Sequence, residues 1–221
     1  MIKRGLAEFL KPGLYGITAE AHARGRDNIR VVQDMLAAGI KIIQYREKEK
    51  SAREKYLQCL RIRELTRQAG AVFIVNDHVD LALLVDADGV HIGQDDLPPD
   101  QVRKLVGQER LIGLSTHSPA QARAARGAGV DYIGVGPLFA TRTKKDVCDP
   151  VGLSYLDYVV KNIDLPFVAI GGIKEHNIGQ VTARGARCVA LVTEIVAAPD
   201  IPAKVAALRQ AMAINNDLTT I

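Results

Sequence analysis

Short apolar runs alternate along the chain with longer segments in which apolar residues recur at helical spacing. The apolar runs are rich in β-branched residues, which favours strands, whereas the longer segments are typical of amphipathic helices. The predicted strands cover residues 14–18, 40–46, 71–75, 89–93, 111–115, 131–136, 166–170 and 188–192. The predicted helices cover residues 27–39, 51–70, 78–87, 98–107, 118–129, 152–163, 175–186 and 200–212. The pattern therefore predicts eight strand–helix units.

Eight such units in 221 residues, without a long linker or a low-complexity segment, indicate one α/β domain folded as a single (β/α)8 TIM barrel. We expect the domain to span residues 1–221, with the barrel at about 13–214. Residues 1–11 are expected to form a short capping helix and residues 215–221 a loose tail. A doubly wound open sheet is the alternative that the same alternation allows.

Polar residues are distributed unevenly between the two ends of the predicted strands. The segments that precede the strands carry few side chains that suit a binding site. The segments that follow the strands are rich in polar and charged residues and include QYREK, GQDD, STH and GPLFATRTKK. In a barrel all carboxyl ends of the strands meet at one mouth, where barrel enzymes place their sites. The sequence therefore predicts one site at that mouth.

The overall charge narrows the class of partner. The formal net charge is +4, but basic and acidic residues are interleaved over 47–64, which is typical of a solvated helix face and not of a nucleic-acid patch. We expect small-molecule substrates and neither nucleic acid nor membrane as partner, because no apolar run reaches membrane-spanning length. Residues 51–70 are a candidate contact surface for a barrel neighbour or for a second subunit, so a homo-oligomer is among the expected arrangements.

The cysteines Cys59, Cys148 and Cys188 match neither a disulfide framework nor the spacing of metal ligands. An odd number of unpatterned thiols favours a reducing compartment. The sequence also begins without the apolar core of a signal peptide, and we expect a cytoplasmic protein.

The stretch IKIIQYREK predicts a strand that ends in a binding site. Side chains alternate along a strand, so Gln44, Arg46 and Lys48 share one face with Ile42. A guanidinium fork and an ammonium aimed together suit the oxygens of a phosphate. A surface salt bridge with neighbouring glutamates is the alternative.

Carboxylates follow the next two strands. Asn76 and Asp77 end one strand, and Asp96 closes HIGQDD after the next, although spacing alone allows Asp95 instead. Mg²⁺ usually takes one or two protein carboxylates and completes its shell with water and substrate phosphates. The pair therefore predicts a magnesium site, with a helix N-cap for Asp77 and a turn for Asp96 as the alternative roles.

The remaining strand ends carry groups that suit a second phosphate. The loop GPLFATRTKKD offers Thr141, Thr143 and Lys144, while Gly171-Gly172 and Val192-Thr193 end the last two strands. Many barrels hold a phosphate on backbone N–H groups at these ends. A solvated loop is the alternative for residues 136–146.

Ser115 and His117 do not form a predicted nucleophilic triad, because no acidic partner is visible in the sequence. We therefore interpret Ser115 as a hydrogen-bonding group. His91 is interpreted as a packed or orienting histidine and not as a general base.

These motifs, taken in order, resemble the thiamine phosphate synthase family over almost the whole chain. The family's Gln-x-Arg-x-Lys pattern matches Gln44 to Lys48, its Asn-Asp pair Asn76-Asp77, its His-x-Gly-Gln-x-Asp stretch His91 to Asp96, its Thr-x-Thr-Lys loop Thr141 to Lys144, and its Gly-Gly-Ile Gly171 to Ile173. The resemblance favours Asp96 over Asp95 as the metal ligand. It implies an enzyme of thiamine biosynthesis, a diphosphate-releasing transferase that joins hydroxymethylpyrimidine diphosphate to a thiazole phosphate with Mg²⁺ as cofactor.

The resemblance also assigns roles to individual residues. Catalytic roles fall on Arg46, Lys48, Ser115 and Lys144. The pyrimidine diphosphate is expected at Gln44, Tyr45, Arg46, Glu47, Lys48, Asn76, Ser115 and Lys144. The thiazole phosphate is expected at Thr141, Arg142, Thr143, Gly172, Val192 and Thr193, and Mg²⁺ at Asp77 and Asp96.

Two departures from the family pattern concern side-chain direction. Tyr45 stands where the family often has Leu, and alternation predicts that its side chain faces the helices. Glu194 adds an acid beside Thr193, and we expect it to point away from the site. A related thiazole tautomerase or regulator, a phosphate-binding sensor barrel and another phosphate-handling barrel enzyme are the competing functions.

Overall fold

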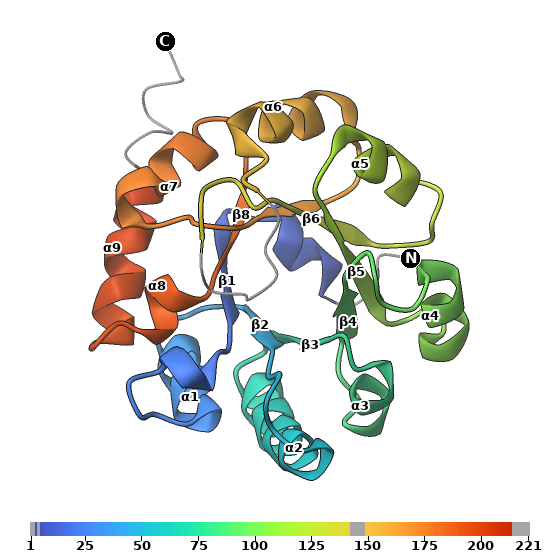
Figure 1. The fold of residues 1–221 in the computed structure, drawn as a ribbon. Helices are drawn as coiled ribbons and strands as arrows, with labels where there is room; N and C mark the ends of the chain where they lie inside the picture. The colour runs from blue at the N-terminus through green and yellow to red at the C-terminus, as the bar shows by residue number, and fades with distance from the viewer. Residues whose placement is uncertain (1–2, 4, 142–148, 214–221) are drawn as a thin grey trace.

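The strands form a closed parallel barrel in which neighbours pair in chain order and the last strand pairs with the first. The computed structural model describes residues 3, 5–141 and 149–213. Figure 1 shows the helices arranged around the strands. The strands are β1 (Gly13–Ile17), β2 (Ile42–Tyr45), β3 (Val72–Asn76), β4 (Gly89–Ile92), β5 (Leu111–Thr116), β6 (Tyr132–Val135), β7 (Phe167–Ala169) and β8 (Cys188–Leu191). The closed order confirms the predicted (β/α)8 barrel and excludes the open sheet.

Each predicted helix is present within its predicted segment or close to it. The helices are η1 (Leu6–Leu10), η2 (Glu20–His22), α1 (Asn28–Ala37), α2 (Ala52–Gln68), α3 (Val79–Leu84), α4 (Pro99–Val106), α5 (Pro119–Ala125), α6 (Gly152–Asn162), α7 (Glu175–Thr182), α8 (Thr193–Val196) and α9 (Ile201–Ala213). The short helices η2 and α8 were not predicted, because one turn is too short to show helical periodicity. The expected tail at 215–221 lies outside the described residues.

Side-chain alternation along β2 divides the core in two. Ile43 and Tyr45 belong to the apolar layer between the strands and the helices. Ile42 belongs to a separate cluster inside the barrel, together with residues of the other strands. Gln44, two residues after Ile42, points inward as well and is 3% exposed. The strand therefore delivers Gln44 to the inside of the barrel, as its alternation predicted.

The 3₁₀ helix η1 closes the amino-terminal end of the barrel. Its buried Phe9 ring lies 4.2 Å from the ring of Tyr132 and 5.9 Å from that of Tyr15, measured between centroids. These aromatic contacts bury apolar surface that the strands alone would leave open. The predicted capping helix is thus present, although it is shorter than residues 1–11.

Local signals in the sequence explain where the helix that follows β2 begins. The Ser51 hydroxyl accepts a hydrogen bond from the Glu54 N–H, and the Glu54 carboxylate accepts one from the Ser51 N–H. This capping box satisfies N–H groups that the first helical turn cannot pair. Because α2 begins at a fixed point, the segment between β2 and α2 has a defined length.

A buried ion pair stabilises the side of the barrel opposite the mouth. Arg63 of α2 donates two hydrogen bonds to Asp88, at 2.7 and 3.1 Å, and both side chains are 5% exposed. The same carboxylate accepts the Phe73 N–H of β3 at 2.8 Å. The pair thus ties α2 to the start of β4.

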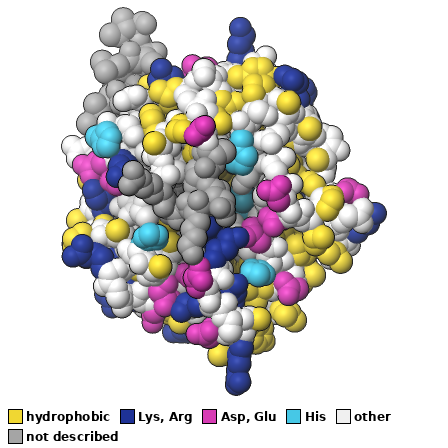
Figure 2. Space-filling view, in the orientation of Figure 1, with side chains coloured by type: hydrophobic (Ala, Val, Ile, Leu, Met, Phe, Trp, Pro, Cys, Tyr) yellow, Lys and Arg dark blue, Asp and Glu magenta, His cyan; other side chains and the backbone are white. Residues whose placement is uncertain are grey.

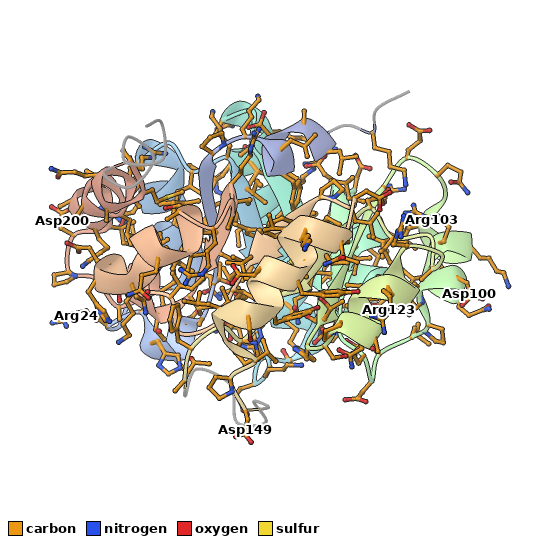
Figure 3. The ribbon with its side chains drawn as sticks, turned by 90° about the horizontal axis from the view of Figure 1, so that it is seen from above. Arg24, Asp100, Arg103, Arg123, Asp149 and Asp200 are labelled. Atoms are coloured by element: carbon orange, nitrogen blue, oxygen red, sulfur yellow. The ribbon has the colours of Figure 1, made fainter. Side chains whose placement is uncertain are left out.

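The surface of the ring is charged and the described thiols are unpaired. Figure 3 shows Arg24, Asp100 and Asp200 at the outer edge of the helical ring. Cys59 and Cys188 are free and buried, whereas Cys148 lies outside the described residues. None of the helices in the described ranges has the length and apolar character needed to cross a membrane.

Candidate active site

A cavity of about 1740 Å³ opens at the carboxyl ends of the strands. Figure 2 shows acidic, basic and histidine side chains gathered around the centre of this face. The lining includes the predicted site residues Gln44, Arg46, Glu47, Lys48, Asn76, Asp77, Asp96, Ser115, Thr141, Gly172, Val192 and Thr193. Arg142, Thr143 and Lys144 lie outside the described residues. The barrel therefore brings the described members of the predicted site to one cavity, apart from Tyr45.

Tyr45 points away from this cavity. Its hydroxyl donates to Gln58 Oε1 of α2 at 2.8 Å, and its ring is packed in the outer core. Alternation along β2 is the cause, since Gln44 and Tyr45 must face opposite sides. The Tyr45 side chain therefore supports the barrel wall and does not line the cavity.

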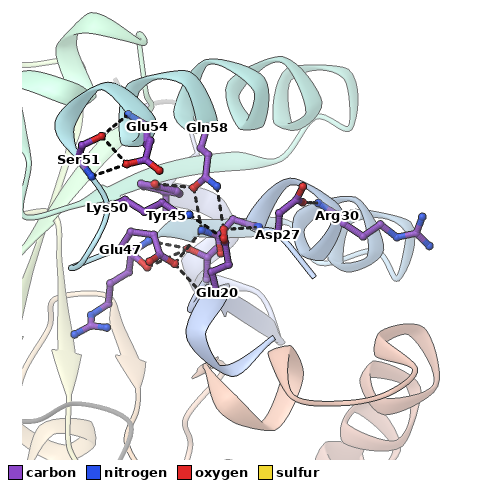
Figure 4. A network of polar contacts seen from close by, with 12 residues as sticks. Glu20, Asp27, Arg30, Tyr45, Glu47, Lys50, Ser51, Glu54 and Gln58 are labelled. Carbon is purple, nitrogen blue, oxygen red and sulfur yellow. Dashed lines mark hydrogen bonds and ion pairs between the residues drawn. The ribbon is translucent and has the colours of Figure 1, made fainter. Parts of the chain in front are cut away.

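A polar network fixes the segment that follows β2, as Figure 4 shows. The Glu47 carboxylate accepts hydrogen bonds from the Glu20 N–H at 2.8 Å and from Asn28 Nδ2 at 2.9 Å. Glu20 in turn accepts from Lys50 Nζ at 2.8 Å and from Gln58 Nε2 at 2.9 Å. Burial opposes ionisation of Glu20, but these hydrogen bonds outweigh it and lower its pKa. The network anchors residues on both sides of Arg46.

Hydrogen bonds of the Arg46 backbone also fix the position of this residue. Its N–H donates to the buried Thr18 hydroxyl at 2.9 Å, and the hydroxyl donates back to the Arg46 carbonyl at 3.3 Å. Burial lowers the pKa of the guanidinium, and the charge of Asp77 opposes that shift. Arginine stays protonated in proteins, so a half-buried positive group lines the mouth on a fixed backbone.

Lys48 and Asp77 form an ion pair at the rim. Lys48 Nζ lies 2.7 Å from Asp77 Oδ2. Burial would raise the pKa of the Asp77 carboxyl, but the hydrogen bond and charge of Lys48 outweigh burial and hold that pKa below its usual value. Asp77 has the left-handed backbone angle φ 61°, which Asp tolerates better than most residues. This conformation turns the chain sharply at the end of β3.

Asp96 shows the opposite shift. Burial raises the pKa of its carboxyl, and the nearby charge of Asp77 adds to the effect, although the Gly93 N–H donates to it at 2.7 Å. Two carboxylates that shift each other's pKa in this way compete for one proton. Among the residues that the structure describes, no group of three or more His, Cys, Asp or Glu side chains could hold a metal ion. Asp77 and Asp96 are therefore two interacting carboxylates that line the mouth.

The Ser115 hydroxyl lies within hydrogen-bond distance of His91, which comes from the neighbouring strand β4. His91 Nε2 lies 3.0 Å from Ser115 Oγ, and His91 Nδ1 lies 3.1 Å from the Tyr132 hydroxyl. Each imidazole nitrogen thus lies beside a hydroxyl group, whereas in a Ser-His-Asp triad one nitrogen faces a carboxylate. The geometry agrees with an orienting role for His91.

Glycines allow the loops after β6 and β7 to touch. A Cβ on Gly172, whose φ is 64°, would lie 2.6 Å from the carbonyl oxygens of Phe139 and Ala140. A side chain at this position would therefore push away the loop that carries Thr141. Gly172 keeps the ends of β6 and β7 together at the mouth.

The Glu194 carboxylate is directed toward α7 and α9, although the residue is among those that line the cavity. Its carboxylate accepts the Glu175 N–H at 3.3 Å and lies 3.5 Å from Lys204 Nζ, so it faces α7 and α9. The neighbouring Thr193 begins α8 beside the cavity. The negative charge of Glu194 is thus paired at the rim.

Sequence reasoning missed two tyrosines beneath the mouth. Tyr15 and Tyr132 are fully buried, line the floor of the cavity, and bond to each other at 3.2 Å. Strand alternation places Tyr15 inside the barrel, and that inward tyrosine was an available signal. Which side chain its hydroxyl meets depends on the register across the barrel, which one sequence does not reveal.

The fold and the mouth define a (β/α)8-barrel protein with ionisable side chains collected at the carboxyl ends of its strands. Comparison with known proteins makes this class specific. Residues 14–195 match the family model described as thiamine monophosphate synthase. The chain belongs to the thiamine-phosphate synthase family, and it is an enzyme.

Individual relatives agree with this assignment over nearly the full length. A thiamine-phosphate synthase of Pelotomaculum thermopropionicum is 70% identical, covering 97% of this chain and 99% of the relative. One of Lawsonia intracellularis is 60% identical, with 92% and 94% covered. The solved thiamine phosphate pyrophosphorylase of Pyrococcus furiosus superposes with a TM-score of 0.84 at 33% identity, covering 94% of this chain and 98% of that one.

Proposed function

We propose that this enzyme joins 4-amino-2-methyl-5-(diphosphooxymethyl)pyrimidine to a thiazole phosphate, giving thiamine phosphate and diphosphate. The observation that carries the proposal is the division of one cavity into two halves. Cations and carboxylates lie at the ends of β2 to β4, and hydroxyl and glycine positions lie at the ends of β6 to β8. Two phosphorylated substrates can therefore meet across the mouth.

The first half suits a diphosphate. Arg46 offers a guanidinium on a fixed backbone, and Lys48 offers an ammonium within reach of Asp77. Such donors bind phosphate oxygens strongly because charge assists the hydrogen bonds. Gln44, Glu47, Asn76 and Ser115 line the same half. The proposal also assigns Tyr45 and Lys144 to the diphosphate, and Lys144 lies outside the described residues.

Asp77 and Asp96 fit a divalent cation. The charge of Asp77 adds to the rise in the pKa of Asp96, so ionising Asp96 beside it costs free energy, and a cation bound by both carboxylates would offset that cost. Two carboxylates are also the number that Mg²⁺ usually takes from a protein when phosphate oxygens complete its shell. Bound there, Mg²⁺ would supply compensation for the charge of the diphosphate.

The protein's own groups then favour departure of the diphosphate. The bond between the pyrimidine methylene and the diphosphate oxygen breaks, and its electron pair leaves with that oxygen. Arg46 and Lys48 stabilise the developing negative charge, and the pyrimidine amino group stabilises the methylene cation. The thiazole nitrogen forms the new bond to the methylene carbon. No protein nucleophile takes part, which agrees with the hydroxyl partners of His91.

The second half orients the nucleophile. Thr141, Gly172, Val192 and Thr193, with Arg142 and Thr143, would hold the thiazole phosphate at the ends of β6 to β8. Holding both substrates in line converts a reaction between two partners into one within a complex, which can lower the barrier by about 7 to 11 kcal/mol. The proposal includes a reducing cytoplasm, in agreement with the buried free thiols of Cys59 and Cys188.

A thiazole tautomerase or a regulatory thiazole-phosphate-binding barrel is the alternative. Such a protein needs the second half of the mouth but not Arg46, Lys48 and the two carboxylates. Calorimetry with each substrate separately tests the difference. We expect the pyrimidine diphosphate to bind only with Mg²⁺, and the thiazole phosphate to bind in its presence. Binding of the thiazole phosphate alone, with no affinity for the pyrimidine diphosphate, would favour the alternative.

A further inference from the structure

A continuous chain of hydrogen-bonded side chains crosses the inside of the barrel beneath the mouth. It starts at Gln44 of β2, whose Nε2 donates to the Tyr15 hydroxyl at 2.8 Å. The Tyr15 and Tyr132 hydroxyls lie 3.2 Å apart, and Tyr132 lies 3.1 Å from His91 Nδ1. It ends at Ser115 of β5, 3.0 Å from His91 Nε2. The chain therefore links two groups of the proposed diphosphate half from below.

The direction of the first bonds follows from the number of protons available. An amide nitrogen only donates, so the Tyr15 oxygen accepts from Gln44. Tyr15 is fully buried, and among the described residues its hydroxyl has a second hydrogen-bond partner in the Tyr132 hydroxyl. The Tyr15 proton can therefore be donated to Tyr132. Burial raises the pKa of both phenols, so each keeps its proton. Tyr15 therefore donates to Tyr132, and Tyr132 donates to His91 Nδ1.

The donor at Tyr132 also determines which imidazole nitrogen of His91 donates to Ser115. Because Nδ1 of His91 accepts, an imidazole with a single N–H carries that proton on Nε2. Nε2–H then donates to Ser115 Oγ, whose own proton is left to donate elsewhere. The Ser115 backbone is held by Gln94 Nε2, which donates to its carbonyl at 2.6 Å, and Ser115 lines the cavity. Its free donor therefore faces the mouth.

We propose that Tyr15, Tyr132 and His91 form a positioning chain that makes Ser115 a hydrogen-bond donor to the departing diphosphate and Gln44 an acceptor for the pyrimidine. This inference rests on the proposed function for the identity of the ligand, and on the barrel interior for the direction of the bonds. With its nitrogen committed to Tyr15, Gln44 offers its oxygen to a donor such as the pyrimidine amino group. Tyr15, Tyr132 and His91 lie at the floor of the cavity and act through these two residues.

The tautomer of His91 tests the direction of the chain without any assay of activity. Nitrogen-15 NMR of the imidazole in the unmodified protein is expected to show the proton on Nε2. In Tyr132→Phe the acceptor Nδ1 loses its donor, and the signal is expected to move toward a mixture of tautomers. A proton on Nδ1 in the unmodified protein would overturn the proposal, and this measurement needs no variant to fold.

A double-variant cycle tests whether the chain acts through Ser115. Tyr132→Phe keeps the ring against Phe9 and is expected to lower kcat by up to about tenfold, which is the effect of losing one neutral hydrogen bond. In the Ser115→Ala background the same change is expected to have less than about a twofold further effect. Full multiplication of the two effects would contradict the proposal.

Tyr155→Phe is the matched control. Tyr155 is another buried tyrosine, and its hydroxyl donates to Thr116 Oγ1 at 2.7 Å on the outer side of β5. It is expected to leave kcat unchanged, and an equal loss of kcat in this variant would reduce Tyr132 to a structural role. If the unmodified enzyme makes no thiamine phosphate, the proposed function fails, whereas the tautomer of His91 still decides the direction of the chain.

Discussion

The ammonium of Lys48 lies 2.7 Å from a carboxylate oxygen of Asp77, so two groups with separate roles in the proposed reaction form an ion pair with each other. Lys48 is proposed to bind the diphosphate, and Asp77 the cation. Binding of a magnesium diphosphate would exchange this direct ion pair for two new ones. The pair therefore keeps both groups charged and close to the mouth before substrate arrives.

Lys48→Ala is predicted to separate binding of the cation from binding of the diphosphate. The variant removes a competitor for Asp77, and an exposed pair is worth about 1 kcal/mol or less. Mg²⁺ alone should therefore bind up to about fivefold more tightly at pH 8, while the magnesium complex of the pyrimidine diphosphate binds more weakly. Calorimetric titration measures both. Lys50→Ala removes the neighbouring lysine, which pairs with Glu20, and should change neither. Weaker binding of Mg²⁺ alone to Lys48→Ala would contradict the arrangement.

Asp96→Asn is predicted to stabilise the protein in the presence of a chelator. The folded-state pKa of Asp96 is raised above its ordinary value of 3.8, so the ionised carboxylate destabilises the fold at neutral pH, by a small amount because the side chain is exposed and solvent screens its charge. The amide oxygen can still accept the Gly93 N–H. Tm should therefore be higher for the variant at pH 7, and the difference should shrink as pH falls toward 4 and Asp96 takes up its proton.

The Asp77 contribution has the opposite sign and a different pH window. Its folded-state pKa is lowered, so its stabilising effect is complete above pH 3.8 and is lost only below that value. Asp95→Asn changes the adjacent exposed carboxylate and should leave Tm unchanged. A lower Tm for Asp96→Asn than for Asp95→Asn at pH 7 would show that Asp96 is not destabilised by Asp77.

Arg46→Ala is predicted to weaken binding of the pyrimidine diphosphate and to spare the thiazole phosphate. Arg46 lies at the end of β2, whereas the second half of the mouth lies at the ends of β6 to β8. A charge-assisted hydrogen bond contributes about 1.5 to 3 kcal/mol, which corresponds to a loss of affinity of about 10- to 150-fold. Calorimetry with each substrate measures the selectivity, with the exposed Arg53→Ala of α2 as control. Equal losses for both substrates would indicate misfolding or a wrong assignment.

Asp88→Ala is predicted to destabilise the fold through a site remote from the mouth. Removing the carboxylate leaves the buried Arg63 guanidinium and the Phe73 N–H without this partner. Breaking a buried ion pair on one side costs about 3 to 5 kcal/mol. Urea denaturation should show this loss of unfolding free energy. Asp157→Ala breaks an exposed pair with Arg184 and should cost less than about 1 kcal/mol, so similar losses in both would contradict the prediction.

The sequence predicted the barrel because each strand–helix unit carries its own local signal. Alternation correctly placed Gln44 inside the barrel and Tyr45 outside it, because the period of a strand is a local property. The uneven distribution of polar residues located the mouth for the same reason, since the carboxyl ends of parallel strands are fixed by chain direction.

The contacts across the barrel were beyond sequence reasoning. His91 and Ser115 come from neighbouring strands, but their contact depends on the β4 to β5 register, in which His91 lies opposite Gly113. The pairing of Tyr15 with Tyr132 spans the barrel between β1 and β6, two strands that are not neighbours. Periodicity predicts which way a side chain faces but not what it meets.

The most direct measurement is the simultaneous appearance of thiamine phosphate and diphosphate from the purified protein. We predict equal amounts of the two products when the pyrimidine diphosphate, the thiazole phosphate and Mg²⁺ are all present. Omission of either substrate or addition of a chelator should abolish both products, and Asp77→Ala should lose the Mg²⁺-dependent turnover while remaining folded. A folded protein that binds the thiazole phosphate but forms neither product would contradict the account.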